Sequence, residues 1–299
     1  MTLKPHPRET TVPTPQPPSV WTRPLRRAGA IQWAALTLLA LGVLASGTAA
    51  LAGWQCPAGW RWLEGGIPVL ASVAVLTALA ARLPLQNVLA CGLLVWLTAA
   101  MVMAICAFTG SPLGPFEFTR ELGVRLMDQV TWPVPFLWLA VVLSARQSAR
   151  VVLRPWRRMK HYGAWLLGVA LVGSLALALT IEPFGRQVLG WWHWPVRTTP
   201  HALWLGAPLM FPAMTAAFTA ALLLIATPWL IAKRPTGGEP DYGPVLTWLA
   251  LDLWAVLGGL SARLWTAAAL GVVAGGALAV LAWHGGHTVL TAPARPETA

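Results

Sequence analysis

The sequence predicts an all-α fold, a polytopic transmembrane helix bundle of about eight helices with both termini on the cytoplasmic side. Apolar residues make up 57% of the 299 residues and charged residues only 10%, whereas a soluble domain carries about 25% charged residues. Uncharged stretches of about 20 residues recur along the chain, and each is long enough to cross about 30 Å of hydrocarbon. The lysines and arginines lie mainly between these stretches, where the residues that set membrane topology are found.

The chain begins with a basic, proline-rich tail over residues 1–27. We expect this tail to be disordered and cytoplasmic, because it has too few apolar residues to form a core. It is not a secretory signal peptide, since the apolar run that follows is too long and lacks a cleavage pattern. We expect a transmembrane helical domain over residues 28–284 and a short cytoplasmic tail over residues 285–299.

Eight apolar segments predict the helices. In order along the chain they span residues 28–54, 67–83, 88–108, 130–144, 163–181, 203–231, 245–260 and 264–283. The fourth and seventh segments are short, and the fourth and sixth contain prolines that predict kinks. Pro183 closely follows the fifth segment, and we expect its helix to end there.

The basic residues predict the orientation in the membrane. With a cytoplasmic N-terminus, 15 of the 21 lysines and arginines lie inside and six lie outside, as the positive-inside rule requires. Residues 146–160 hold six of the inside group, and we expect this loop to contact anionic membrane lipids. A nucleic-acid partner is not expected, because no soluble domain is large enough to present the charges on one face. The predicted location is the inner cell membrane.

Three carboxyl groups are candidates for chemistry. Asp252 lies inside the seventh segment, where a carboxylate costs about 2.5–3.5 kcal/mol, so we expect it to face the bundle interior as a structural or a functional group. Glu182 ends the fifth segment at the outer edge of the hydrocarbon. It is either paired with Arg186 or Arg197, or a carboxylic acid that can donate a proton. Glu117 lies in an outer loop.

Nineteen tryptophans are the next feature, and many lie near segment ends. An aromatic belt at the headgroup level accounts for most of them, while some are candidates to line a pocket or to stabilise a cation with their π faces. The cysteines and histidines lack metal-ligand spacing, and no nucleotide-binding motif is present, so we expect neither a metal nor another cofactor. Chemistry at such a site needs only protons, water or binding.

Two segments carry a resemblance to a known family. The first contains Gly-Ser-Pro-Leu-Gly-Pro-Phe-Glu-Phe-Thr at 110–119, Leu-Gly at 122–123 and Val-Thr-Trp-Pro-Val-Pro-Phe-Leu-Trp at 130–138. The second contains Glu-Pro at 182–183, Gly-Trp-Trp-His-Trp at 190–194 and Gly-Ala-Pro-Leu-Met-Phe at 206–211. In the order and spacing of these motifs, roughly residues 105–235 resemble the integral-membrane carotenoid biosynthesis proteins of the carotenoid 1,2-hydratase and bisanhydrobacterioruberin hydratase type.

The resemblance implies cofactor-independent hydration of a terminal C=C bond in an acyclic carotenoid end group. A carboxylic acid protonates the alkene, and water captures the cation that results. The implied acid candidates are Glu182, Glu117 and Asp252. The implied substrate-binding residues are Phe116, Phe118, Trp138, Trp191, Trp192, Trp194 and His193. The implied partners are a carotenoid or another long apolar lipid, the membrane lipids, and other carotenoid enzymes.

Alternative functions stay open. Leu113, Phe116 and Phe118 stand where the family usually has tyrosine or histidine, and this favours a non-catalytic carotenoid- or lipid-binding protein or an assembly partner of a pigment complex. A small-solute transporter needs more polar groups inside the membrane than Asp252 offers. Charge-derived topology puts both resembling segments on the outer side. We therefore expect a pocket between the 109–131 and 182–202 loops, with Glu117 close to Glu182.

Overall fold

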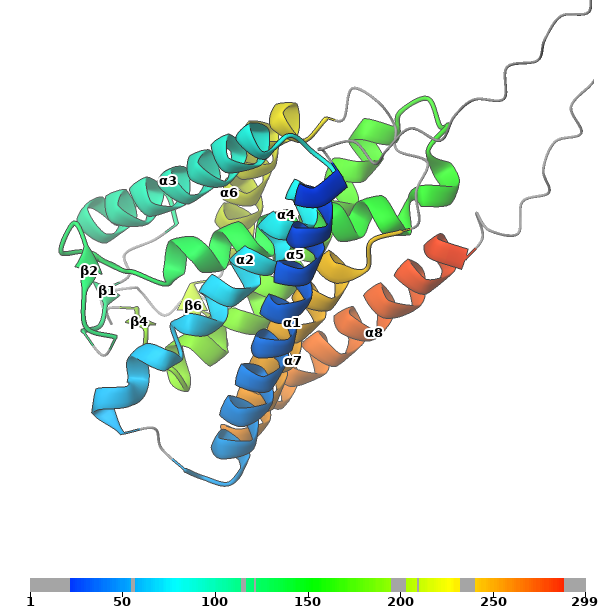
Figure 1. Cartoon of the computed structure of the whole chain (residues 1–299). Helices are drawn as coiled ribbons and strands as arrows, with labels where there is room; N and C mark the ends of the chain where they lie inside the picture. The colour runs from blue at the N-terminus through cyan, green and yellow to red at the C-terminus, as the bar shows by residue number, and fades with distance from the viewer. Residues whose placement is uncertain are drawn as a thin grey trace, which may run out of the picture.

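The computed structural model describes residues 22–54, 57–113, 117–120, 122–194, 203–208, 210–231 and 240–287, and within them the chain forms a bundle of eight α-helices (Figure 1). These are α1 (Thr22–Leu51), α2 (Gly66–Ala80), α3 (Leu85–Thr109), α4 (Val134–Val152), α5 (Tyr162–Gln187), α6 (Phe211–Ala226), α7 (Gly243–Ser261) and α8 (Trp265–His287). Three short 3-10 helices are η1 (Ala58–Leu63), η2 (Arg154–Trp156) and η3 (Thr227–Leu230). The predicted helix bundle is confirmed.

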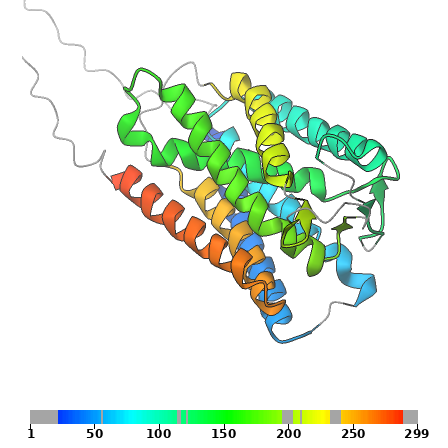
Figure 2. The same cartoon turned by 180° about the vertical axis from the view of Figure 1, so that it is seen from behind.

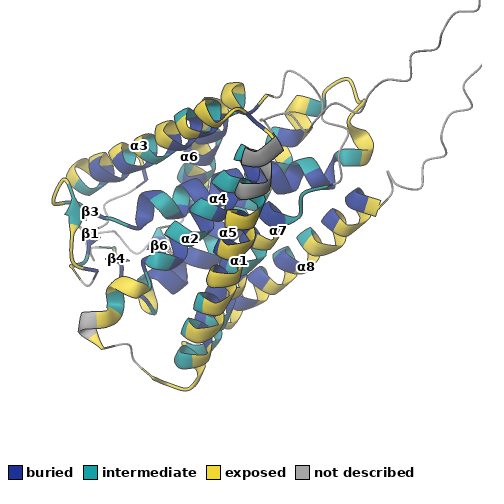
Figure 3. Cartoon of the chain, in the orientation of Figure 1, coloured by how far each residue is buried: buried dark blue, intermediate teal, exposed yellow. Residues whose placement is uncertain are grey.

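Seven of the eight described helices, all except α4, are long and apolar enough to cross a membrane. Figure 3 shows exposed residues along the outward faces of α1, α3 and α8, and many of these residues are large and apolar. Leu89 and Leu93 on α3 and Val272 and Val280 on α8 are each more than half exposed. In water such surfaces would be unfavourable, but they are the surfaces that hydrocarbon requires. The chain is therefore a multi-pass membrane protein.

Helix α4 is the exception because it lies in the middle of the bundle. It contacts α2, α3, α5, α7 and α8, and nearly all of its residues are buried (Figure 3). Its C-terminal half contains Arg146, Gln147 and Ser148, which lower its hydropathy but are buried within the protein. The predicted segment 130–144 was therefore too short. Polar residues interrupt the apolar sequence after residue 144, but the helix continues for eight more residues and ends at Val152.

Helix α5 continues through Pro183 to Gln187, so the prediction that Pro183 ends the helix is wrong. A proline inside a helix removes one backbone hydrogen bond and crowds the preceding turn. Here a residue beyond the helix stabilises the turn that follows Pro183, because the Trp191 N–H donates a hydrogen bond to the Gly185 carbonyl oxygen at 3.0 Å. Tertiary contacts thus outweigh the local preference.

The predicted segment 203–231 does not begin as a helix. Strands β5 (Leu203–Trp204) and β6 (Ala207–Pro208) form a hairpin, in which Leu205 and Gly206 have positive φ angles. Helix α6 begins only at Phe211.

The first and last helices extend beyond their predicted bounds. Helix α1 begins at Thr22, inside the segment expected as a tail, and α8 extends to His287. Residues 1–21 and 288–299 lie outside the described residues, and so do most of the expectations for both tails.

Short β ribbons gather at one end of the bundle, and the α4–α5 connection lies at the other end (Figures 1 and 2). Strand β1 (Glu117–Phe118) pairs antiparallel with β4 (Trp192–His193), and β2 (Arg125–Leu126) pairs with β3 (Val130–Thr131). The β1–β4 pair joins the two segments that carry the family resemblance, so these segments meet as expected. The side that faces the cytoplasm stays a prediction.

Candidate functional site

A cavity of about 60 Å³ lies at the ribbon end of the bundle. Residues from α3, α4, α5, the start of α6 and the β1–β4 ribbon form its wall. The apolar lining consists of Met103, Leu113, Phe118, Val134, Leu137, Trp138, Val141, Ala178, Ile181, Trp192, Trp194 and Phe211. Among the described lining residues, Glu182 carries the only ionisable side chain.

Both carboxyl oxygens of Glu182 accept hydrogen bonds from indole N–H groups. Glu182 lies in the last turns of α5 and is 3% exposed. Its Oε2 accepts from Nε1 of Trp192 at 2.8 Å, and its Oε1 accepts from Nε1 of Trp194 at 2.7 Å. These two donors satisfy a carboxyl group that would otherwise be buried without partners.

Of the two arginines proposed from the sequence as partners of Glu182, Arg186 lies among the described residues and makes no hydrogen bond to Glu182 there. Nη2 of Arg186 instead donates to the carbonyl oxygen of Leu205, at 2.5 Å, and so holds the β5–β6 hairpin. A side chain at Gly206 would collide with this guanidinium, so glycine leaves the space that Arg186 occupies. Arg197 lies outside the described residues.

The β1–β4 ribbon separates the predicted residues into two groups. Phe118 pairs with Trp192, and both line the cavity. Glu117 pairs with His193 on the other face, where both are exposed and His193 Nε2 lies 3.0 Å from Glu117 Oε2. Successive side chains of a strand point to opposite faces. Glu117 and His193 therefore do not line the cavity, and the structure does not bring Glu117 beside Glu182 there.

Three hydrogen bonds hold the segment before β4, two to the residue that follows β1 and one to the end of α5. The Thr119 N–H donates to the carbonyl oxygen of Trp191 at 3.0 Å, and the Thr119 hydroxyl donates to that of Gly190 at 2.5 Å. The Trp191 N–H donates in turn to the carbonyl oxygen of Gly185 at 3.0 Å. The backbone just before Trp192 is therefore held by Thr119 on one side and by the end of α5 on the other.

Gly185 is a site residue that sequence reasoning missed. A Cβ at this position would lie 2.3 Å from the Trp192 ring, so only glycine lets the indole lie against α5 and reach Glu182 three residues earlier. Glycine inside a helix costs roughly 1 kcal/mol relative to alanine. Because glycine is unfavourable there, its presence at position 185, within one helical turn of Glu182, indicates in the sequence that another group packs closely against the helix.

The remaining predicted aromatic residues have different surroundings. Trp138 lines the cavity and packs edge-on against Phe218, with ring centroids 4.9 Å apart. Trp191 does not line the cavity, because its fully buried ring packs between those of Trp192 and Trp254. Phe116 lies outside the described residues.

Asp252 on α7 is 5% exposed and faces other helices, as predicted. Its carboxyl group packs against the bare backbone of α8, where a Cβ at Gly271 or Gly275 would lie 2.9 or 2.6 Å from its oxygens. Within the described residues its Oδ1 has no hydrogen-bond partner. Asp252 does not line the cavity that contains Glu182.

The cavity suits a slim apolar group more than a polar ligand. One water needs about 10–15 Å³, so 60 Å³ offers room for about four to six such groups, the size of a branched chain end. Aromatic rings surround this space, and their π faces attract a cation. In the part of the chain that the structure describes, no cluster of three or more His, Cys, Asp or Glu side chains is arranged to hold a metal ion.

A family model described as carotenoid biosynthesis protein matches residues 64–278, which is well over half of the chain and extends beyond the two segments that carry the resemblance. No curated protein and no solved structure matches the chain.

Proposed function

The chain belongs to the carotenoid biosynthesis protein family, and on that premise we propose that it adds water to a terminal C=C bond of an acyclic carotenoid end group without a cofactor. Its role in carotenoid biosynthesis follows from the family. The observation that supports hydration is the position of Glu182, a buried carboxyl group in an otherwise apolar, aromatic cavity with an indole N–H on each oxygen.

The first step is proton transfer from Glu182 to the less substituted carbon of the terminal C=C bond. A C–H bond forms, the π bond breaks, and the neighbouring tertiary carbon becomes a cation while Glu182 becomes a carboxylate. The hydrogen bonds from Trp192 and Trp194 strengthen as negative charge develops, since bonds to charged acceptors are stronger than neutral ones. Indole and phenyl faces beside the cavity stabilise the cation.

In the second step water completes the reaction. Its oxygen bonds to the tertiary carbon, and the proton that it loses returns to the Glu182 carboxylate. The product is a tertiary alcohol, and the acid is restored without any oxidant or reductant. A single carboxyl group therefore serves as acid and then as base, and the reaction requires neither Glu117 nor Asp252.

A second candidate is non-catalytic binding of a carotenoid or another long apolar lipid, as an assembly partner of a pigment complex. The composition of the cavity favours it, because the described lining offers no second carboxyl group, and no hydroxyl, amide or imidazole group, to position a water. Leu113 and Phe118, which line the cavity, stand where the family usually has tyrosine or histidine. In this case Glu182 serves to hold the ribbon through Trp192 and Trp194.

The two candidates are separated by Glu182→Gln, with Glu117→Gln as the matched control. Each variant is expressed in a host that makes an acyclic carotenoid, and the pigments are measured by mass spectrometry. Glutamine keeps the size of the side chain but has no acidic proton, so we expect hydration to fall by about 100-fold or more, while Glu117→Gln stays at the wild-type level. Binding of unchanged carotenoid by all three proteins favours the second candidate, and full hydration by Glu182→Gln contradicts the first.

We also propose that the protein lies in the inner cell membrane with the ribbon end facing outward. The excess of basic residues in the connections at the opposite end supports this orientation. The substrate is apolar, so it reaches the protein through the bilayer after synthesis by other carotenoid enzymes of the same membrane.

A further inference from the structure

A cavity of about 510 Å³, much larger than the one that contains Glu182, also lies at the ribbon end of the bundle. It is enclosed by the last turns of α1, α5 and α7, by η1 and by the start of α2, and we call it the α1–α7 cavity. Glycines and alanines of α1 form much of its wall. Its polar lining residues are Ser46, Arg61, Glu64, Gln187 and Ser261.

The α1–α7 cavity is open at its rim and ends on buried aromatic rings. Trp54 and Gln187 at the rim are exposed, whereas Phe184 and Trp254 are buried. These two buried rings pack edge-on with their centroids 4.9 Å apart. The Phe184 ring also lies close against α7, because a Cβ at Gly258 would collide with it. At about 10–15 Å³ for each water, a volume of 510 Å³ holds tens of waters.

A single layer of indole separates this cavity from the one that contains Glu182. On one side the Trp191 ring packs against Trp254, which lines the α1–α7 cavity, with ring centroids 5.8 Å apart. On the other side it packs against Trp192, which lines the Glu182 cavity, with centroids 6.4 Å apart. Phe184, at the end of the α1–α7 cavity, follows Glu182 by two residues on the same helix. The two cavities are therefore neighbours.

The indole N–H of Trp191 is a polar group within this layer. The N–H of Trp254 donates to the Ser46 hydroxyl at 3.1 Å, and that of Trp192 donates to Glu182. Nε1 of Trp191 is buried and has no hydrogen-bond partner among the described residues. Burying a donor without a partner is costly, and ordered water commonly satisfies such groups. This N–H is therefore suited to bind a water between the two cavities.

The hydration reaction needs such a source of water. It consumes one water for each C=C bond, but the Glu182 cavity has only about the size of the chain end that it would hold. Its described lining includes no hydroxyl or amide group that could store a water. Water that entered freely would also surround the acid before the alkene arrives. The water must therefore come from a neighbouring space and enter in a controlled way.

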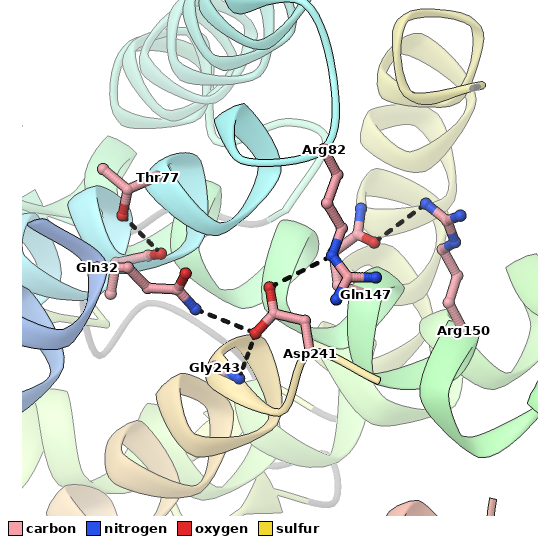
Figure 4. Close-up of polar contacts among 8 residues, drawn as sticks. Gln32, Thr77, Arg82, Gln147, Arg150, Asp241 and Gly243 are labelled. Atoms are coloured by element: carbon pink, nitrogen blue, oxygen red, sulfur yellow. Dashed lines mark hydrogen bonds and ion pairs between the residues drawn. The ribbon is translucent and has the colours of Figure 1, made fainter. Parts of the chain in front are cut away.

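The cavity at the opposite end of the bundle is a poorer source. It measures about 50 Å³ and shares no described lining residue with the Glu182 cavity. Polar contacts join α1 to the start of α7 there (Figure 4). Oδ1 of Asp241 accepts hydrogen bonds from Nε2 of Gln32 at 3.1 Å and from the Gly243 N–H at 2.9 Å. Its Oδ2 lies 3.8 Å from Nε of Arg82.

We propose that the α1–α7 cavity supplies the water of the hydration reaction, and that this water binds to the Trp191 N–H on its way to the Glu182 cavity. This inference rests on the hydration proposed above. The water oxygen then bonds to the tertiary cation, and the proton that the water loses returns to Glu182, so no other reactant is needed. Trp191 is a positioning residue, since it does not line the cavity in which the alkene reacts.

The test places a label in the α1–α7 cavity of the full chain, purified in detergent. Ser46→Cys lines the cavity, while the control Thr48→Cys lies exposed on the same helix and does not line it. Both are made in a Cys56→Ser background, because Cys91 and Cys106 are buried. A charged, water-soluble methanethiosulfonate should label Ser46→Cys about tenfold faster, since a thiol in apolar surroundings forms less thiolate. Equal labelling rates would overturn the proposal.

Labelled and unlabelled Ser46→Cys are then compared in carotenoid hydration. The label obstructs the supply of water but lies outside the Glu182 cavity. We therefore expect turnover to fall by about tenfold or more while KM for the carotenoid stays unchanged. Full turnover after complete labelling removes this inference alone. If the unlabelled wild-type protein hydrates no carotenoid, the proposed function fails, and this inference fails with it.

Two buried tryptophans provide matched variants for the role of the N–H. Trp191→Phe keeps an aromatic ring but removes the donor, and we expect turnover to fall by about tenfold. Trp248 is also buried, donates to the carbonyl oxygen of Gly173 at 3.2 Å and lines neither cavity. Trp248→Phe should keep the turnover of the folded protein even if it melts at a lower temperature. Equal turnover of the two variants contradicts the role of Trp191.

Discussion

The packing of Trp192 on Gly185 can be tested with a single methyl group, in Gly185→Ala. The added Cβ would lie 2.3 Å from Cη2 and 2.6 Å from Cζ2 of the indole, whereas carbon atoms in contact are about 3.5–4.0 Å apart. The ring must therefore move by more than about 1 Å. Its N–H, now 2.8 Å from Oε2 of Glu182, would then leave the carboxyl group.

The expected cost has two opposing parts. Losing a hydrogen bond to a buried acceptor costs about 1–3 kcal/mol, and inserting a methyl group into a packed contact costs a further 1–3 kcal/mol or so. Replacing a helical glycine by alanine returns about 1 kcal/mol. We expect the free energy of unfolding to fall by roughly 2–4 kcal/mol in Gly185→Ala, together with loss of carotenoid hydration.

The matched control is Gly168→Ala on the same helix, where a Cβ meets no atom within 4 Å. It receives the same helix-propensity gain without the collision, so we expect it to be neutral or slightly more stable. Both variants are unfolded by a denaturant titration in detergent micelles, and tryptophan fluorescence reports the environment of the indoles. If Gly185→Ala matches Gly168→Ala in stability and fluorescence, the reasoning about Trp192 is refuted.

Three further predictions test other contacts. Trp194→Phe keeps an aromatic ring but removes the N–H donor to the carboxyl group of α5, so hydration should fall by about tenfold; unchanged turnover in the pigment assay would show that this bond does not stabilise the developing charge. Gly275→Ala places a Cβ 2.6 Å from Oδ2 of Asp252 and should lower the melting temperature by destabilising the α7–α8 contact. In the control Gly276→Ala the added Cβ meets nothing within 4 Å, so the melting temperature should not fall. Equal melting temperatures of the two variants would contradict this packing. A reporter that is active only in the cytoplasm should be active when fused after Ala299, and activity solely of a periplasmic reporter would reverse the predicted orientation.

The sequence was sufficient to predict the helix bundle and the meeting of two distant segments. Hydropathy predicted the helices because the lipid-facing surfaces need long apolar stretches. The family resemblance singled out residues 110–123 and 182–194, and the topology derived from charge alone put both segments on one side. Strands β1 and β4 within them indeed pair. The indole groups of Trp192 and Trp194 were predicted near the site, although their hydrogen bonds to Glu182 were not.

Other features could not be predicted, because they depend on packing. In a ribbon of two-residue strands, a shift of one residue decides which side chain faces the cavity, so Glu117 could not be separated from Phe118 by pattern alone. The end of the α5 helix depends on backbone contacts beyond Pro183. The second half of α4 looked too polar for a membrane helix because its burial by other helices leaves no trace in local hydropathy.

The most direct test of the account is isotope incorporation by the purified protein. The wild-type protein and Glu182→Gln are incubated with an acyclic carotenoid in D₂O or in H₂¹⁸O, and the products are analysed by mass spectrometry. We expect the wild-type product to gain one carbon-bound deuterium per hydrated end group in D₂O and one ¹⁸O in H₂¹⁸O, and we expect Glu182→Gln to give almost no product. A hydroxylated product whose oxygen does not come from water, or equal product from Glu182→Gln, would contradict it.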